Sequence, residues 1–258
     1  MVTVIKNFFK YKEFLASVVK RDITKKYYKS YLGIIWTILN PLLSALVITI
    51  VFSALFQRSI PNFPVYLLCG HLMFHFNSDA TSVSMHSMLK NSGIIRKIYI
   101  PKYMFVVSDL TVSLVNLAFA FIPLVVVYLF RGGTITWLWL LIPFVVLIQA
   151  LFTLGLSLIL AAYSVFFRDL THLYGVILTL WMYLSAIFYP ISIVPDKYVF
   201  IWRLNPMVHY ITLLRNIIYE ATLPAMDNVV IGTIYGVLTL ALGCVIFSEN
   251  QDKFFLYL

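Results

Sequence analysis

The sequence predicts an all-α polytopic membrane protein with six transmembrane helices. Hydrophobic residues make up 62% of the 258 positions and charged residues only 11%, whereas soluble domains carry roughly 25% charged residues. Six segments are apolar enough to cross the hydrocarbon core, which takes about 20 helical residues. The basic residues gather on one side of these segments. This length leaves no room for a large soluble domain, so any ATPase that drives the protein must lie on another chain.

Residues 1–31 are expected to form a cytoplasmic amphipathic helix in the membrane interface. Its apolar face is formed by Val4, Phe8, Tyr11, Leu15 and Val18, at steps of four and three residues. Lysines fill much of the remainder and would lie at lipid phosphates. No apolar core of a cleavable signal is evident here. The helix is either a simple anchor or a lever for a cytoplasmic partner, and the sequence leaves both open.

The rest of the chain, residues 32–258, is expected to form one six-span transmembrane domain. The spans are expected at residues 32–56, 65–88, 103–130, 137–166, 173–189 and 229–247. Asp79 in the second span and Asp109 in the third are ionisable groups at membrane depth, which makes each a functional-site hypothesis. The alternative for Asp79 is a packing group satisfied by polar neighbours. A proton relay would need more such groups than His71, His75 and Asp79.

Residues 198–219 are apolar but are not expected to form a seventh span. Asn205-Pro206 interrupts them, and Arg203, His209 and Arg215 add polar groups. A charge at mid-bilayer costs roughly 2.5–3.5 kcal/mol. We therefore predict two short helices that dip into the membrane or lie on one face, within an outer re-entrant segment at residues 190–227.

The distribution of basic residues predicts the orientation. With the N-terminus in the cytoplasm, 14 of the 19 Lys and Arg residues lie on the cytoplasmic side, and both termini are cytoplasmic. The net charge of +9 is therefore attributed to membrane topology and not to nucleic-acid binding. The basic loop at residues 89–102 can form a short helix along the membrane. It either docks on a soluble partner or only follows the positive-inside rule.

Motifs for chemistry on this chain are lacking. The sequence contains no glycine-rich phosphate loop, no dinucleotide fingerprint and no metal-ligand spacing. Cys69 and Cys244 lie in apolar segments and are expected to be packing residues. The loop carboxylates Asp196, Glu220 and Asp227 are isolated. We therefore expect no catalytic residue, metal or cofactor on this chain, which argues against a membrane enzyme.

Four blocks of sequence resemble the membrane subunit of ABC-2 type polysaccharide exporters, the family for O-antigen, capsule and teichoic-acid chains. The blocks are Arg21-Asp22-Ile23 through Asn40-Pro41-Leu42; Ile94 through Pro101; Phe167-Arg168-Asp169-Leu170-Thr171-His172; and Ser185-Ala186-Ile187-Phe188-Tyr189-Pro190 with Leu204-Asn205-Pro206-Met207 and Arg215. Together they extend over nearly the whole chain in the family's order. One departure is Ala186, where the family often has proline.

The resemblance implies the permease subunit of an ATP-driven exporter of a lipid-linked polysaccharide in the cytoplasmic membrane. Two copies would line a path at their interface, and two copies of a separate ATP-binding subunit would hold ATP and Mg. The implied ATPase-coupling residues are Arg21, Asp22, Arg96, Lys97, Tyr99, Pro101, Arg168 and Asp169. The implied outer gate comprises Asn205, Pro206 and Arg215.

A sugar polymer needs aromatic faces and polar groups along its path, because sugars stack on rings and form hydrogen bonds. The expected path residues are Phe74, Phe76, Asp79, Trp181, Tyr183, Phe188 and Tyr189. The alternative for any single ring is a place in the core or against lipid.

Other functions compete with glycan export. The same fold could export a drug or a lipid. A membrane-embedded transferase that modifies glycans or lipids would need clustered carboxylates or histidines in its loops, and an ion-coupled transporter would be expected to show inverted repeats and more intramembrane charge.

Overall fold

The computed structural model describes residues 11–27, 60–97 and 100–257. Between residues 28 and 59 it describes only 35–36, 39–40, 42–44, 46–47 and 50–51. Most of the expected first span at residues 32–56 therefore lies outside the described residues, as do Val4 and Phe8.

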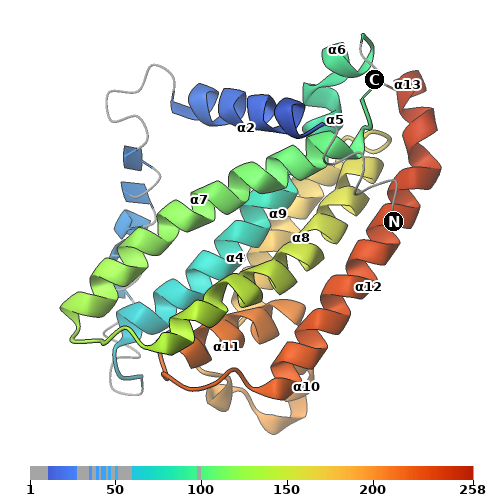
Figure 1. Ribbon diagram of the computed structural model, residues 1–258. Helices are drawn as coiled ribbons and strands as arrows, with labels where there is room; N and C mark the ends of the chain where they lie inside the picture. Colours follow the sequence, from blue (N-terminus) through green and yellow to red (C-terminus); the bar gives the residue numbers. More distant parts are fainter. Residues whose placement is uncertain are drawn as a thin grey trace.

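The described part of the chain is helical and contains no strand. Its bundle is formed by α4 (Phe63–Met85), α7 (Tyr103–Phe130), α8 (Ile142–Ser164), α9 (Leu170–Leu184) and α12 (Met226–Asn250). The helix α2 (Lys12–Tyr27) lies across one end of this bundle (Figure 1). We call this the α2 end. The same end carries the short helices α5 (Ser87–Lys90), α6 (Ser92–Ile95), η5 (Gln251–Lys253) and α13 (Phe254–Tyr257).

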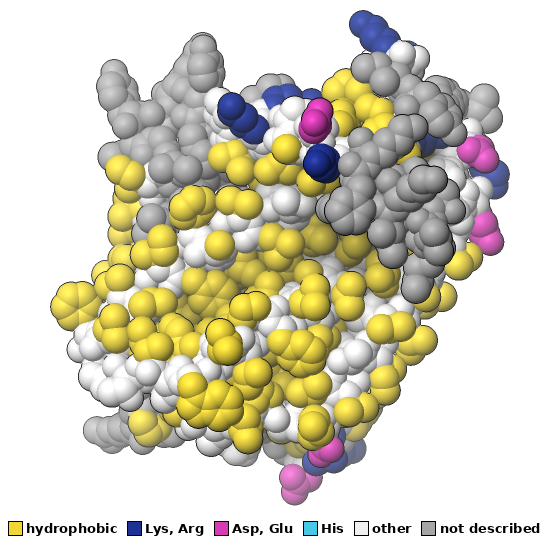
Figure 2. Space-filling view, viewed as in Figure 1, with side chains coloured by type: hydrophobic (Ala, Val, Ile, Leu, Met, Phe, Trp, Pro, Cys, Tyr) yellow, Lys and Arg dark blue, Asp and Glu magenta, His cyan; other side chains and the backbone are white. Residues whose placement is uncertain are grey.

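Three helices are long and apolar enough to cross a membrane: Tyr103–Phe130, Trp137–Ser164 and Met226–Lys253. The second of these includes the short helix η2 (Trp137–Leu141) that precedes α8. The helix α4 has 23 residues but is more polar, and α9 has only 15. At 1.5 Å per residue α9 extends about 22 Å. Figure 2 shows apolar side chains over the middle of the visible face and charged ones at its two ends, as a bilayer requires.

The expected fifth span ends earlier than its hydropathy indicates. Residues 173–189 are apolar, but α9 ends at Leu184. The next residues form a turn in which Ala186 has a φ of 50°, a left-handed conformation that does not continue an α-helix. The expected second span, residues 65–88, likewise ends as α4 at Met85.

The opposite end carries η3 (Ile191–Ile193), η4 (Asp196–Tyr198), α10 (Val199–Arg203) and α11 (Pro206–Ile218). Asn205-Pro206 separates the last two, so the segment predicted to break there does form two short helices. Asn205 caps α11 and Pro206 occupies its first position, where the missing N–H costs nothing. The helix α11 is almost entirely buried and packs against α4, α8 and α12.

Glycines bring α8 and α12 into backbone contact. The buried residues of α12 include Gly232, Gly236 and Gly243, and the first two have the four-residue spacing of close helix pairs in membranes. A Cβ on Gly236 would lie 3.0 Å from the Ile148 carbonyl oxygen. A Cβ on Gly155 would overlap the backbone of α12, and one on Gly243 would overlap the backbone of Gly155.

Replacing Gly155 by leucine should therefore separate α8 from α12. The collision is with backbone, so no side-chain rotation can relieve it, and overpacking of this kind costs at least about 1–3 kcal/mol. We expect loss of the monodisperse peak in size-exclusion chromatography in detergent. Gly175→Leu is the matched control, because a Cβ on Gly175 of α9 meets nothing within 4 Å. Equal behaviour of the two variants would contradict the packing role of Gly155.

Candidate functional site

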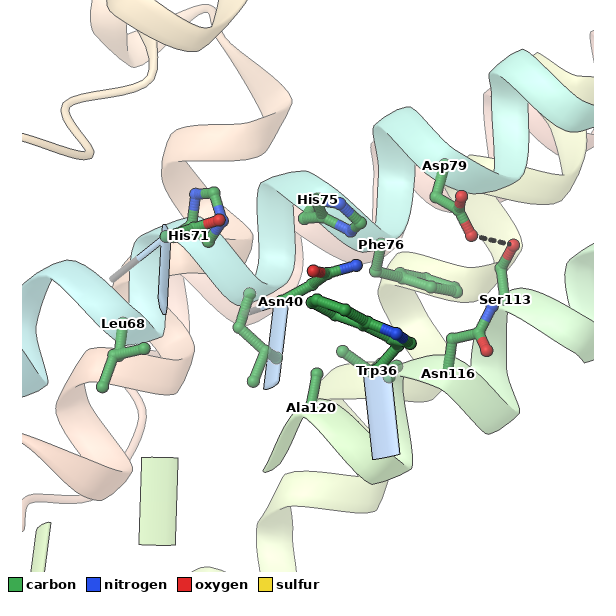
Figure 3. Close-up of a pocket in the computed structure, with 13 residues that line it drawn as sticks. Trp36, Asn40, Leu68, His71, His75, Phe76, Asp79, Ser113, Asn116 and Ala120 are labelled. Carbon is green, nitrogen blue, oxygen red and sulfur yellow. Dashed lines mark hydrogen bonds between the residues drawn. The ribbon is translucent and has the colours of Figure 1, made fainter. Parts of the chain in front are cut away.

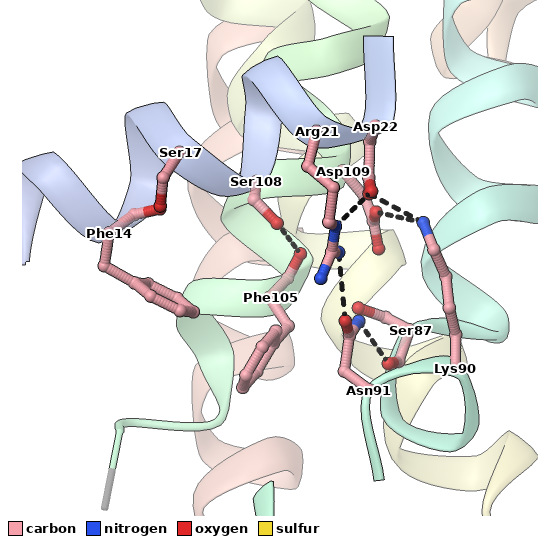
Figure 4. A network of polar contacts seen from close by, with 10 residues as sticks. All are labelled: Phe14, Ser17, Arg21, Asp22, Ser87, Lys90, Asn91, Phe105, Ser108 and Asp109. Atoms are coloured by element: carbon pink, nitrogen blue, oxygen red, sulfur yellow. Dashed lines mark hydrogen bonds and ion pairs between the residues drawn. The ribbon is translucent and has the colours of Figure 1, made fainter. Parts of the chain in front are cut away.

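A polar network joins α2 to the helices beneath it at the α2 end (Figure 4). At its centre the Asp22 carboxylate accepts hydrogen bonds from Arg21 Nε at 2.8 Å and from Lys90 Nζ at 2.7 Å. Lys90 Nζ also lies 3.7 Å from the Asp109 carboxylate of α7. Lys90 in α5 is therefore shared by carboxylates of two other helices.

Asn91 extends the network into the loop that follows. Its side-chain oxygen accepts a hydrogen bond from Arg21 Nη2 at 3.2 Å, and its amide nitrogen donates to the Ser87 carbonyl at 2.9 Å. A movement of this loop would therefore pull on α2 and α7 together.

Burial and charge balance each other in this network. Burial alone would raise the pKa of the Asp22 carboxyl, but the hydrogen bonds and charges of Arg21 and Lys90 outweigh it and hold the pKa below its ordinary value. Asp109 is 1% exposed, and its Oδ2 has no hydrogen-bond partner among the described residues. An ionised carboxylate in such surroundings needs a nearby cation, and Lys90 provides it.

An apolar core supports the network from below. The ring of Phe14 in α2 contacts the edge of Phe105 in α7, with centroids 5.5 Å apart. Val18 is buried, whereas Lys12 and Lys20 of the same helix are exposed. The core at this end contains Met88, Ile95, Phe105, Val106, Leu158, Ala161, Ala162, Val165, Phe247 and Phe254.

The end of α12 and the helix α13 close this core. Phe254 is fully buried and its ring contacts Phe247 and Phe166. Lys102 donates to the Gln251 carbonyl, and its ammonium lies 5.7 Å from the Phe254 ring centroid. Burial lowers the pKa of Lys102, an effect that Asp252 partly offsets. The loop before α7 is thereby tied to α12.

The expected coupling residues fall into two groups at this end. Arg21 and Asp22 lie inside the network. Arg96 and Lys97 follow α6, and Arg168 and Asp169 form the turn before α9; all four are exposed, while Pro101 is half-buried. Tyr99 lies outside the described residues.

The expected path residues lie in three separate places within one chain. Phe76 and Asp79 line a cavity between α4 and α7. Phe74 points the other way from α4 and meets Trp181 edge-on, with centroids 6.2 Å apart. The third group, Tyr183, Phe188 and Tyr189, surrounds the turn after α9, where the Tyr189 hydroxyl donates to the Tyr183 carbonyl.

Asn205 uses all of its side-chain hydrogen-bonding groups to join α11 to the end of α9. Its Oδ1 accepts from Met207 N at 3.0 Å and from Trp181 Nε1 at 2.8 Å. Its Nδ2 donates to the Leu184 carbonyl at 3.0 Å and to Ser185 Oγ at 3.2 Å. This expected gate residue therefore fixes the distance between two helices, while Pro206 starts the second of them.

Arg215, the third expected gate residue, is buried in α11 and ties the turn after α9 to α4. Its guanidinium donates to the carbonyls of Ala186 at 2.9 Å, Ile187 at 3.0 Å and Tyr66 at 3.3 Å. The same group lies 3.4 Å from the centroid of the Tyr66 ring. No ion pair is formed by Arg215 in the described part of the chain, so carbonyl oxygens and the ring satisfy it.

Sequence reasoning did not include Lys90, Asn91 and Tyr66 among the site residues. Asp109 was recognised only as an ionisable group at membrane depth. The sequence did carry one signal for this pair. Asp109 is a carboxylate early in the third expected span, and Lys90 is a lysine just after the second expected span. No comparable signal marks Tyr66.

The sequence is similar to known transport proteins over nearly its whole length. A family profile described as ABC-2 type transporter matches residues 13–219. An O-antigen export system permease protein, RfbA of Myxococcus xanthus, is 32% identical over 98% of both chains. RfbA of Klebsiella pneumoniae is 28% identical over 94% of this chain and 93% of its own. KpsM of Escherichia coli, a polysialic acid transport protein, is 22% identical over 90% of this chain and 91% of its own.

Proposed function

The chain belongs to the ABC-2 type transporter family, and from this premise we propose that it is the permease subunit of an ATP-driven exporter of a lipid-linked polysaccharide. The observation that carries the proposal is the 32% identity, over 98% of both chains, to an O-antigen export permease. The family implies that ATP is hydrolysed on a partner chain. We propose that two copies of this chain assemble with two ATP-binding subunits, which hold ATP and Mg.

We further propose six spans over residues 32–258, with α4 and α9 as the second and fifth, in the cell membrane. Residues 1–31 form the interfacial helix, and both termini are cytoplasmic. The α2 end is then the cytoplasmic end, which agrees with the exposed Arg96, Lys97 and Arg168 there. The segment at residues 190–227 dips into the outer leaflet, which the short lengths of α10 and α11 support.

The ATP-binding subunits dock, in this proposal, on the exposed residues of the α2 end. Arg96 and Lys97 contact them directly, together with Arg168 and Asp169. The network around Asp22 and Lys90 then passes the movement to α2 and α7, because it connects them through hydrogen bonds. Tyr99 and Pro101 shape the loop between these contacts and α7.

The glycan moves, in this proposal, along aromatic and polar side chains that the two copies of the subunit share. Tyr183 is 53% exposed on α9, beside the exposed apolar residues Leu173, Val176 and Leu180. A second copy packed on this face would bring the third group of path residues together with its own. The outer gate, Asn205, Pro206 and Arg215, holds the exit at the far end of α9.

Reversing the charges of Arg96 and Lys97 to glutamate should uncouple ATP hydrolysis from export. Both side chains are exposed and lie outside the Asp22 network, so insertion and folding should remain intact. We expect glycan-stimulated ATPase activity in proteoliposomes to fall at least tenfold. The matched control reverses Arg131 and Lys197, two exposed cations outside the α2 end. Normal export by the first variant would contradict the docking role.

Reconstitution tests the function itself. The chain is placed in proteoliposomes with a partner ATP-binding subunit, with the cytoplasmic face outward, and lipid-linked glycan and ATP are added outside. We expect the glycan to stimulate ATP hydrolysis and to become protected from an externally added glycosidase. Stimulation by a phospholipid or a drug but not by the glycan would favour the alternative cargo. A change in the covalent structure of the glycan would point to the transferase alternative.

A further inference from the structure

A cavity of about 320 Å³ lies between α4, α7 and the described residues 36, 40 and 44 (Figure 3). Figure 3 shows Trp36 and Asn40 entering it from one side, His75 and Asp79 from α4, and Ser113 and Asn116 from α7. The described residues that line it are Trp36, Asn40, Ser44, Leu68, His71, Leu72, His75, Phe76, Asp79, Ser113, Asn116, Leu117 and Ala120.

The cavity uses a face of α4 that the bundle core leaves open. His71, His75 and Asp79 follow one another at four-residue steps and so lie on one side of the helix. The opposite side packs inward: Asn77 accepts a hydrogen bond from Thr153 of α8, and Thr81 accepts one from Tyr174 of α9. The polar residues of α4 therefore fall into two sets. One set packs against α8 and α9, and the other lines the cavity.

Polar groups in the cavity are available to a ligand. Asp79 Oδ2 accepts one hydrogen bond, from Ser113 Oγ at 2.9 Å. Within the part of the chain that the structure describes, the side chains of His75 and Asn116 form no hydrogen bond. Each offers both donor and acceptor capacity. A ligand with several hydroxyl groups matches such a lining, since a hydroxyl also donates and accepts.

An aromatic ring completes the lining. Trp36 is 36% exposed and borders the cavity, whereas Phe76 beside it is only 2% exposed. An aromatic ring offers an apolar face beside polar edges. A pyranose has the same combination, with C–H groups on its faces and hydroxyls at its rim. The volume is at the lower end of that of small-molecule sites, about 300–1,000 Å³, which suits one or two sugar units and excludes a folded polymer.

The charges of the lining select among sugars. Among the described residues it contains the carboxylate of Asp79 and two imidazoles, but no lysine or arginine. The carboxylate of an acidic sugar would lie near Asp79 without a fixed cation, and like charges at short range in a partly dry site repel strongly. Hydroxyl or amino groups would instead meet an acceptor.

We propose that this cavity binds one neutral, hydroxyl-rich sugar unit of the glycan and disfavours acidic sugars. The inference rests on the proposed function, since it treats glycan as the cargo. It adds a place and a charge preference that neither the family nor the expected path residues provide. Trp36 stacks on the sugar face, while His75, Asp79 and Asn116 bind its hydroxyls.

Protection of a cysteine from alkylation tests the proposal on the complete complex with its ATP-binding subunit. Ala120→Cys places a thiol in the cavity without removing a polar group. Lys253→Cys, at an exposed position of the α2 end outside the lining, is the control in a parallel preparation. N-ethylmaleimide labelling of each introduced thiol is followed by mass spectrometry, with maltotetraose or the equally long tetragalacturonate at tens of millimolar. Ser44→Cys is a second reporter if the first variant does not assemble.

We expect maltotetraose to slow labelling of the thiol introduced by Ala120→Cys at least fivefold, tetragalacturonate to slow it less than twofold, and neither to change labelling of the thiol introduced by Lys253→Cys. Trp36→Leu or Asn116→Leu should raise the half-protecting concentration about tenfold, which corresponds to about 1.4 kcal/mol. Trp137→Leu, at a tryptophan outside the cavity, should leave it unchanged. Asp79→Asn should weaken the discrimination against the acidic probe.

Equal protection by both probes would overturn the charge preference, and protection by neither would overturn sugar binding and leave a water-filled cavity. Its failure is distinguishable from failure of the proposed function. If the chain exports glycan but the cavity does not bind it, glycan-stimulated ATPase activity persists without protection of the introduced thiol. If the chain does not export glycan, that stimulation is absent whatever the labelling shows.

Discussion

Replacing Arg215 by leucine is expected to give the most severe loss of folded protein of any single change considered for this chain. The substitution leaves the carbonyls of Ala186 and Ile187 without the donors that now satisfy them, and it removes the bond to the Tyr66 carbonyl, which keeps its partner within α4. A buried acceptor without a partner costs about 1–3 kcal/mol, and two are created together. The turn after α9 would separate from α4, and α11 would lose its anchor. We expect almost no monodisperse protein after detergent extraction.

Two further variants make this prediction specific. Arg215→Lys keeps the charge, but an ammonium cannot reach three carbonyls in the plane of a guanidinium or stack on Tyr66 in the same way, so we expect an intermediate loss. Arg203→Leu removes an exposed arginine from the neighbouring α10 and should fold normally. If Arg215→Leu were as stable as Arg203→Leu in a thermal-shift assay, the tie between α11 and the turn would be unimportant.

Replacing Lys90 by methionine is expected to abolish coupling between the ATP-binding subunit and the spans. It removes the cation shared by the buried carboxyls of Asp22 and Asp109. The Lys90 side chain is itself 40% exposed, so the loss should lie below the about 3–5 kcal/mol that removing one member of a fully buried ion pair costs. Asp22 keeps Arg21, but Asp109 loses its nearby cation. We expect glycan-stimulated ATPase activity to fall at least tenfold and α2 to become accessible to protease.

A double-mutant cycle that combines Lys90→Met with a change at Asp109 tests whether these two residues are coupled. Asp109→Asn removes the charge that Lys90→Met leaves uncompensated, so the double variant should be more stable than Lys90→Met alone. Lys253→Met, at an exposed lysine, is the control. Additive losses in the double variant would contradict the coupling of Lys90 with Asp109.

The pH dependence of the Asp22 ion pairs follows from the pKa of its carboxyl. This pKa is lowered in the folded protein, so the ion pairs stabilise the fold above the unfolded pKa and are lost only as the pH falls through the lower folded value. We therefore expect the difference in thermal stability between the native chain and Asp22→Asn to stay constant through neutral and mildly acid pH.

Long apolar runs made the three clearest spans predictable. The expected residues 103–130 coincide with α7, while the expected 137–166 and 229–247 lie close to η2–α8 and α12. Hydropathy failed where an apolar stretch is not helical: Phe188 and Tyr189 are apolar enough for a span but lie in a turn beyond α9. An apolar stretch in a helix and one in a turn differ here by the left-handed backbone at Ala186, which hydropathy does not encode.

The candidate sites were predictable where the signal is local. Asn205 followed by proline is a helix start that can be recognised from two residues, and α11 does begin there. The partners of Arg215 and Lys90 come from distant parts of the chain, so no local pattern identifies them. The expected path residues share a composition but not a direction: Phe74 and Phe76 lie two residues apart and point to different sides of α4.

The left-handed turn at Ala186 also limits which substitutions and segments can be transferred from related proteins to this chain. The family resemblance leads us to expect proline at this position, and proline fixes φ near −65°, whereas Ala186 has a φ of 50°. Consensus mutagenesis, which often stabilises proteins, would here displace the carbonyl that Arg215 binds. The backbone at this turn must therefore follow a different course in proline-bearing relatives, and a chimaera between them needs its junctions outside the whole α9–α11 unit.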